Sequence, residues 1–209
     1  VHATLAEEFP TRERGPEQMR ELAAAMNRRL DEALPVAPAL AEHEAALRAA
    51  YDDVANHPGD RAQQVHGDLH LGQTLRTVHG WKIVDFEGEP AKPLAERVLP
   101  DSPWRDVAGV LRSFDYAPQV VAMGLGDGHD EAERQRRFRA VEWSARNRAA
   151  FLDAYAGGRE LTDAEQALLT AYVADKAVYE TVYETRNRPA WVDVPLAAIG
   201  RELSAGGAA

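Results

Sequence analysis

Apolar residues recur at helical spacing along most of the chain, and this pattern predicts a mainly helical protein. The first long helix is predicted to open at Gly15 and Pro16 and to end at Pro35. A second is predicted from Pro38 to the turn at residues 57–59. The apolar positions that we expect these segments to turn towards the core are Met19, Leu22, Met26, Leu30, Leu40, Leu47, Tyr51 and Val54.

The second half of the chain continues the helical pattern. Segments 131–155 and 163–185 are long and amphipathic, and Thr162 is placed to cap the latter. Segment 104–123 is also predicted to be helical, with Pro118 breaking or kinking it. We further expect a flexible turn at 124–128, a short helix at 196–203 and a flexible tail at 204–209.

Short strands are predicted only in the region 62–89. Residues 62–65 form an approach segment that we expect to be a strand. Residues 74–78 and 81–84 are predicted to pair as a hairpin, because His79 and Gly80 between them suit a tight turn. The segment 88–103 contains four prolines and is predicted to be a loop rather than a helix.

Composition narrows the class of protein. The chain of 209 residues is long enough for one core, and no linker divides it. Its net charge of −10 argues against a nucleic-acid partner. No apolar run is long enough for a membrane span, no signal pattern is present, and the lack of cysteine fits a cytoplasmic location. Because the chain starts at Val1, we expect a fragment or a processed chain.

The chemistry is concentrated in the stretch His66-Gly67-Asp68-Leu69-His70-Leu71-Gly72-Gln73 and in Asp85-Phe86-Glu87. Phosphoryl transfer needs one carboxylate to orient the attacking hydroxyl and other oxygen ligands to hold Mg²⁺ against the nucleotide phosphates. The predicted hairpin brings Asp85 beside Gln73, so that an amide oxygen and a carboxylate oxygen point to one hard cation. Asp68 is then the candidate catalytic base, and Gln73 and Asp85 are the candidate metal ligands.

Other interpretations of these residues are weaker. A Gly-Asp pair is common in turns, and Asp85 could cap a helix. A metal site made of His66, Asp68 and His70 would need a helix, whereas Gly67 and Gly72 indicate a loop. His70 either lines the site or packs to support the loop, and it is given no catalytic role.

The spacing of His66, Asp68 and Gln73, followed by Asp85, resembles that of protein kinases, with Gly67 where those have arginine. That change is typical of small-molecule kinases similar to aminoglycoside phosphotransferases. The stretches 66–73, 85–90, 93–97, 101–103, 105–109 and 111–116 further resemble bacterial maltokinases. The resemblance implies transfer of the γ-phosphoryl group of ATP to maltose, with Mg²⁺ as cofactor, giving maltose 1-phosphate. It also implies a possible association with trehalose synthase.

The resemblance assigns further residues. Asp106 matches the aspartate that accepts hydrogen bonds from the catalytic-loop backbone, and His66 supports the same loop. Lys176, Tyr179 and Glu180 resemble the maltose-contacting helix of the family, and Lys176 and Tyr179 share one helix face.

The fold class implied is the C-terminal lobe of a protein-kinase-like fold, mainly α with a small β-hairpin. We expect one domain over 1–203, with the catalytic loop and hairpin at 62–89 and a helical sugar-binding part at 101–203. The N-terminal β-rich lobe is expected to be absent, because no glycine-rich loop precedes His66 and the first lysine is Lys82. ATP would be held through that missing lobe, and the fragment alone is expected to be inactive.

Two alternatives remain open. The parent protein could phosphorylate another small substrate, such as an amino sugar or an aminoglycoside. The chain could instead be a non-catalytic module that binds sugar or docks on trehalose synthase.

Overall fold

The computed structural model describes residues 1–89, 93–123 and 131–205. Eight α-helices, three short 3-10 helices and four strands are found in these ranges. The α-helices are α1 (His2–Glu8), α2 (Pro16–Ala33), α3 (Glu44–Val54), α4 (Leu94–Arg97), α5 (Pro103–Met123), α6 (Glu131–Ala156), α7 (Asp163–Asn187) and α8 (Asp193–Ala205). The 3-10 helices are η1 (Pro38–His43), η2 (Leu71–Gln73) and η3 (Pro189–Trp191), and the strands are β1 (Arg12–Arg14), β2 (Asp60–Ala62), β3 (Thr74–Thr77) and β4 (Gly80–Ile83).

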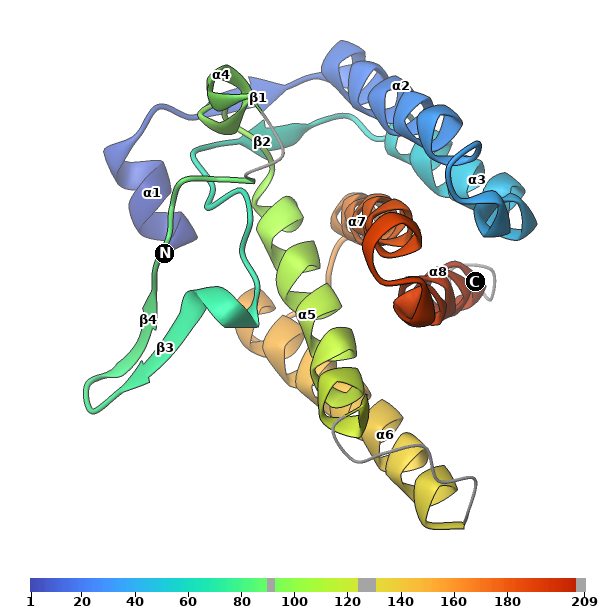
Figure 1. Cartoon of the computed structure of the whole chain (residues 1–209). Coiled ribbons are helices and arrows are strands. Elements are labelled where there is room, and N and C mark those ends of the chain that lie inside the picture. The colour runs from blue at the N-terminus through green and yellow to red at the C-terminus, as the bar shows by residue number, and fades with distance from the viewer. Residues whose placement is uncertain (90–92, 124–130, 206–209) are drawn as a thin grey trace.

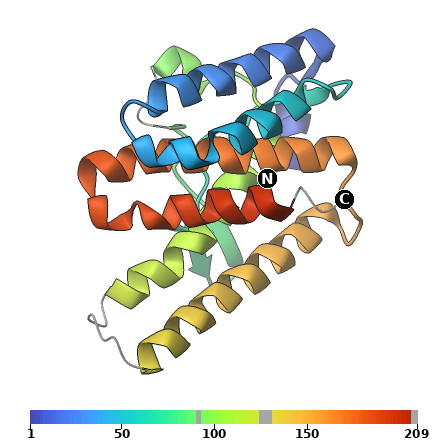
Figure 2. The same ribbon diagram turned by 90° about the vertical axis from the view of Figure 1, so that its right-hand side faces the viewer.

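The long helices stack in layers, with α2 and α3 above, α7 and α8 in the middle, and α5 and α6 below (Figures 1 and 2). Helix α7 occupies the centre and packs against α2, α3, α5 and α8. The core includes the predicted apolar positions of α2, η1 and α3, and only Leu22 among them stays partly exposed. The periodicity of the sequence thus correctly identified the buried face of these helices.

Three predicted helices differ in their limits from those of the structure. Helix α5 continues through Pro118 to Met123, so Pro118 does not break the helix, and its C-terminal half packs on α6. The predicted alternative, a kink at Pro118, stays a prediction. The segment predicted from Pro38 is divided into η1 and α3. Helix α8 starts at Asp193 and includes the first two residues of the predicted tail. Residues 206–209, and the predicted turn at 124–128, lie outside the described residues.

The strands form two separate antiparallel pairs. The predicted hairpin is present as β3 and β4, with Thr74 opposite Ile83, and Gly80 takes the positive φ of 105° expected for this turn. The strand predicted at 62–65 lies earlier, at Asp60–Ala62, and pairs with β1. The loop after the hairpin contains the one-turn helix α4, a correction to the prediction that this segment has no helix. No β-rich lobe occurs in the described ranges.

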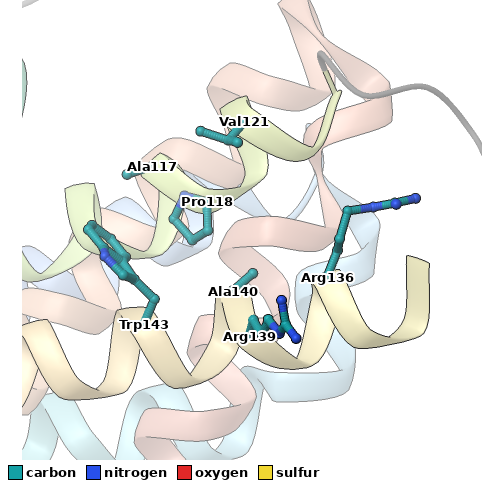
Figure 3. A pocket seen from close by; sticks show the side chains of 7 residues that line it. All are labelled: Ala117, Pro118, Val121, Arg136, Arg139, Ala140 and Trp143. Carbon is teal, nitrogen blue, oxygen red and sulfur yellow. The ribbon is translucent and has the colours of Figure 1, made fainter. Parts of the chain in front are cut away.

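An apolar groove of about 430 Å³ lies between the C-terminal half of α5 and the N-terminal half of α6 (Figure 3). Its residues are Ala117, Pro118, Val121, Arg136, Arg139, Ala140 and Trp143. The groove is at the opposite end of α5 from Asp106. None of the helices in the described ranges combines the length and the apolar character that a membrane crossing requires.

Candidate active site

The candidate catalytic loop, residues 66–73, is held in place by the buried side chain of His66. Its Nε2 lies 2.8 Å from the carbonyl oxygen of Val84, and its Nδ1 accepts the backbone N–H of Asp68 at 3.3 Å. The carbonyl can only accept, so Nε2 is the donor in this contact and Nδ1 is the acceptor in the other. The ring also packs against Phe86 at a centroid distance of 4.8 Å. His66 therefore joins the loop that carries Asp68 to the strand end that carries Asp85.

Asp106, in the first turn of α5, anchors the same loop from the other side. Its side chain is fully buried, and it accepts the backbone N–H of His66 at 2.7 Å and that of Gly67 at 2.9 Å. The family resemblance implied these two hydrogen bonds for Asp106. The effect of Asp106 on turnover stays a prediction. Gly67 has a φ of 85°, a backbone conformation that residues with a side chain rarely adopt. The turn at Gly67 places Asp68 at the cleft.

Asp68 lies at the wall of a cleft of about 280 Å³ between the catalytic loop and α7. The ammonium of Lys176 lies 3.3 Å from its carboxylate and 3.6 Å from that of Glu89, and it sits 5.0 Å from the centre of the Tyr179 ring. Burial lowers the pKa of Lys176, but the nearby charges of Glu89 and Asp68 outweigh this, so the pKa is raised. Lys176 is therefore cationic at neutral pH.

Glu180 has a different environment from its neighbours Lys176 and Tyr179. Its carboxylate is paired with the buried guanidinium of Arg112, at 2.8 Å from Nε and 2.6 Å from Nη2. Burial raises the pKa of Glu180 although Arg112 opposes this. Lys176 and Tyr179 line the cleft, whereas Glu180 does not. Its assignment as a sugar ligand stays a prediction.

Gln73 and Asp85 meet, as the hairpin predicted. The amide Nε2 of Gln73 donates to Oδ2 of Asp85 at 2.8 Å, so the amide nitrogen rather than its oxygen faces the carboxylate. Asp85 has a φ of 67°, a left-handed conformation that is uncommon outside glycine and concentrated at functional sites. The oxygen atoms of one amide and one carboxylate are ligands that suit Mg²⁺. This cation takes most of its other ligands from water and phosphate.

The described residues hold no cluster of three or more His, Asp or Glu side chains placed to bind a metal. A magnesium site here would therefore rest on Gln73 and Asp85 together with the nucleotide. The amide of Gln73 can turn its oxygen towards a cation, since the two ends of the group are interchangeable by rotation.

Sequence reasoning missed a chain of charged residues along the cleft. Arg105 joins Glu89 at 3.0 Å to Asp101 at 3.1 Å, and Asp101 is also bound by Tyr172 at 2.8 Å. Burial opposes ionisation of Asp101, but Arg105 and Arg14 lower its pKa overall. Among the residues that the structure describes, the charged ones lining the cleft are Asp68, Glu89, Asp101, Asp175, Arg29, Arg105 and Lys176. Glu89 had a signal in the sequence, because it lies two residues after Asp85-Phe86-Glu87.

A buried aspartate that anchors a loop, a second aspartate presented into a cleft, and an adjacent amide–carboxylate pair are the parts that a small-molecule phosphotransferase requires. Residues 1–161 match the model of the phosphotransferase enzyme family, and the chain belongs to this family. The fold is the C-terminal lobe of the kinase-like fold that this family uses.

The relatives are sugar kinases. The chain is 32% identical over 210 residues to a glucosamine kinase of Streptacidiphilus jiangxiensis, covering 93% of this chain and 45% of that one. It is 31% identical over 147 residues to a glucosamine kinase of Mycolicibacterium smegmatis, covering 68% of this chain and 34% of that one. The chain thus spans less than half the length of these relatives.

Solved structures agree with this relationship. A glucosamine kinase structure matches with a TM-score of 0.81 and 28% identity, over 97% of this chain and 50% of that one. A glucosamine kinase in complex with glucosamine, ADP and inorganic phosphate matches with a TM-score of 0.77 and 28% identity, over 99% of this chain and 48% of that one.

Proposed function

We propose that the protein to which this chain belongs is an ATP-dependent kinase of an amino sugar, with glucosamine as the first candidate. The observation that carries the proposal is the pair of carboxylates, Asp68 and Glu89, that flanks Lys176 in the cleft. Of the described residues that line the cleft, four are acidic and three are basic, which favours a cationic acceptor. The names of the two relatives support the same substrate class.

In this proposal Asp68 accepts the proton of the sugar hydroxyl as the hydroxyl oxygen forms a bond to the γ-phosphorus of ATP, the bond from that phosphorus to the β,γ-bridging oxygen breaks, and ADP leaves. Gln73 and Asp85 would hold Mg²⁺, which supplies neutralising charge for the phosphates. Asp106 and His66 keep the loop in place, and Tyr179 offers an aromatic face to the sugar.

The maltose interpretation differs in the acceptor alone. The relatives give no support to maltose, or to trehalose synthase as a partner, so both remain expectations from the sequence motifs. A docking module without catalysis is also less well supported, because the loop, the cleft and the Gln73–Asp85 pair are all present.

A substrate panel on the full-length protein tests the proposal. ADP release with ATP and Mg²⁺ is measured for glucosamine, N-acetylglucosamine, glucose and maltose. We expect glucosamine to have the highest kcat/KM, and Asp68→Asn to lower its kcat by about 10²–10⁴-fold, the range for loss of a general base. A higher kcat/KM for maltose would overturn the amino-sugar assignment. Retention of more than about a tenth of kcat by the variant would exclude Asp68 as the base.

A further inference from the structure

His2 connects the first helix to the catalytic loop. Helix α1 buries none of its residues, yet the side chain of His2 is only 14% exposed. Its Nε2 lies 2.9 Å from Oδ2 of Asp106, and its Nδ1 lies 2.8 Å from the hydroxyl of Tyr155 on α6. The carbonyl oxygen of His2 also accepts the side-chain amide of Gln63 at 2.8 Å. Three contacts therefore hold this residue in one place.

The contact with Asp106 completes the binding of a buried carboxylate. Oδ1 accepts the N–H of Gly67, and Oδ2 accepts both the N–H of His66 and the imidazole of His2. A carboxylate only accepts, so Nε2 of His2 carries the proton. Hydrogen bonds to a buried carboxylate are strong and directional, because the charge has no access to water. His2 is thus the side-chain donor that sets which way the two oxygens of Asp106 point.

Tyr155 holds His2 from the opposite side. Burial and the nearby charge of Asp106 raise the pKa of Tyr155 to about 12, so the phenol stays protonated and can donate to Nδ1. Its ring stacks on Phe151 at 6.1 Å and meets Trp104 edge-on at 5.5 Å. The position of His2 is therefore fixed by the packing of α5 and α6, independently of the catalytic loop.

We propose that His2 is a positioning residue for phosphoryl transfer: held by Tyr155, it orients Asp106, which in turn fixes the backbone of His66 and Gly67 and so the direction of Asp68. The inference rests on the proposed function in naming the reaction. It extends that function by assigning a role to a residue more than sixty positions before the catalytic loop. A displacement of the reacting groups of about 1 Å can cost 10²-fold in rate, which is the scale of the expected effect.

The test compares His2→Ala with His2→Gln in the full-length protein, since the amide nitrogen of glutamine can take the place of Nε2. For His2→Ala we expect kcat to fall by about 10–10²-fold. Its KM values for sugar and ATP should stay near those of the wild type, and exchange of the His66 and Gly67 amide protons should be faster. The His2→Gln variant should recover most of kcat and the slow exchange. Glu7→Gln, on the exposed face of α1, is the matched control and should change neither.

The proposal is overturned if His2→Ala keeps kcat within about twofold of the wild type, or if exchange at His66 and Gly67 is unchanged in that variant. It is also overturned if His2→Gln is as impaired as His2→Ala while melting at the wild-type temperature. If His2→Ala does not fold, Tyr155→Phe, which removes only the outer hydrogen bond, is measured instead and should give a smaller change in the same direction. A wild-type protein that phosphorylates no sugar would remove the proposed function, and amide exchange would then decide on the contact alone.

Discussion

The ammonium nitrogen of Lys176 lies 3.3 Å from Oδ1 of Asp68, so that a cation already sits against the candidate catalytic base. The same ammonium is 3.6 Å from Glu89. Because the pKa of Lys176 is raised, this positive charge persists over the whole neutral range. A sugar acceptor that enters the cleft must therefore share these carboxylates with Lys176. The charge of the acceptor then influences how tightly it binds.

Replacement of Lys176 by methionine is expected to favour a cationic acceptor. The change removes one positive charge with little change in volume, and charges a few ångströms apart interact by about 1–4 kcal/mol near a protein surface. The ratio of kcat/KM for glucosamine to that for glucose should rise by about fivefold or more, as measured by ADP release. An equal fall for both sugars would mean that Lys176 acts on the acceptor hydroxyl or on Asp68 rather than on substrate charge.

Asp85→Asn is expected to weaken the response to Mg²⁺ while keeping the fold. Asparagine tolerates the left-handed conformation of residue 85 and can still accept from Gln73, so only the charge is lost. The Mg²⁺ concentration for half-maximal activity should rise by about tenfold or more, since Mg²⁺ binds through one or two carboxylates in such sites. Asp53→Asn on α3 serves as a control for loss of an exposed aspartate. Unchanged Mg²⁺ dependence in Asp85→Asn would contradict the metal assignment.

The helices were predictable from the sequence because their apolar residues recur at a local period that one face of a helix must bury. The hairpin was predictable from the turn residues His79 and Gly80 between two short strand-like segments, and with it the meeting of Gln73 and Asp85. The pairing of β1 with β2 was not, since it joins residues 12–14 to residues 60–62 and β1 is entirely charged. Helix α1 was missed as well, because it buries no residue and leaves no apolar pattern.

In the candidate site, too, the residues that lie close together in the sequence were predictable, and the contacts between distant segments were not. Asp68, Gln73 and Asp85 come from one continuous segment, so their spacing and the predicted hairpin between Gln73 and Asp85 could make them candidates. Glu89, Arg105 and Lys176 converge from three separate segments, and their mutual contacts depend on how α5 and α7 pack. Such long-range juxtapositions have no local signature. A break at Pro118 was also wrong as a prediction, because a proline lowers helix stability locally whereas packing on α6 holds α5 together.

Gly109 is expected to tolerate no side chain. It lies on α5 against the catalytic loop, and a Cβ atom there would collide with the backbone carbonyl oxygen of Leu69. Overpacking of this kind costs about 1–3 kcal/mol, and here it would also displace the loop that carries Asp68. Gly109→Ala should therefore lower both the free energy of unfolding and kcat.

Gly200 in α8 provides the matched control for this substitution. The nearest atom to a Cβ at Gly200 is Cε1 of His43, at 3.8 Å, which is ordinary contact. Because alanine is the better helix former, Gly200→Ala should stabilise the protein by up to about 1 kcal/mol and leave kcat unchanged. Chemical denaturation of both variants checks the pair. Equal stability of the two variants would show that α5 does not press on the loop.

Glu180→Gln is expected to affect stability rather than sugar binding. The carboxylate is paired with the buried Arg112, and breaking a buried ion pair costs about 3–5 kcal/mol. Because Arg112 keeps its ion pair with Asp115 at 2.7 Å and burial raises the pKa of Glu180, the free energy of unfolding should fall by only part of this amount, while KM for the sugar stays unchanged. Tyr179→Leu should do the opposite and raise KM for the sugar without a large loss of stability, because it removes the aromatic face of a residue that lines the cleft. A raised KM in Glu180→Gln without a loss of stability would support the direct sugar contact that the sequence suggested.

The N-terminus of α7 is expected to make the stability of the protein depend on pH. Glu165 binds Arg159 at 2.6 Å and accepts the backbone N–H of Thr162 at 2.9 Å, and Thr162 in return accepts the N–H of Glu165. Its hydrogen bond with Arg159 is the main cause that lowers the pKa of Glu165 to about 2. A depressed carboxyl pKa stabilises the folded state above the pKa of the unfolded chain, and this contribution is lost as the pH falls through the folded value.

Glu165→Gln, which keeps the capping geometry but removes the charge, isolates this contribution. The difference in unfolding free energy between wild type and variant should be constant above about pH 4.5 and should vanish as the pH approaches about 2. Because the ion pair is partly exposed, its size should be no more than about 1 kcal/mol. Urea unfolding between pH 2 and pH 7 measures it, with Glu160→Gln beside it as the control for an exposed carboxylate. A difference that stays constant down to the lowest pH would mean that the charge of Glu165 contributes nothing and that hydrogen bonding alone caps α7.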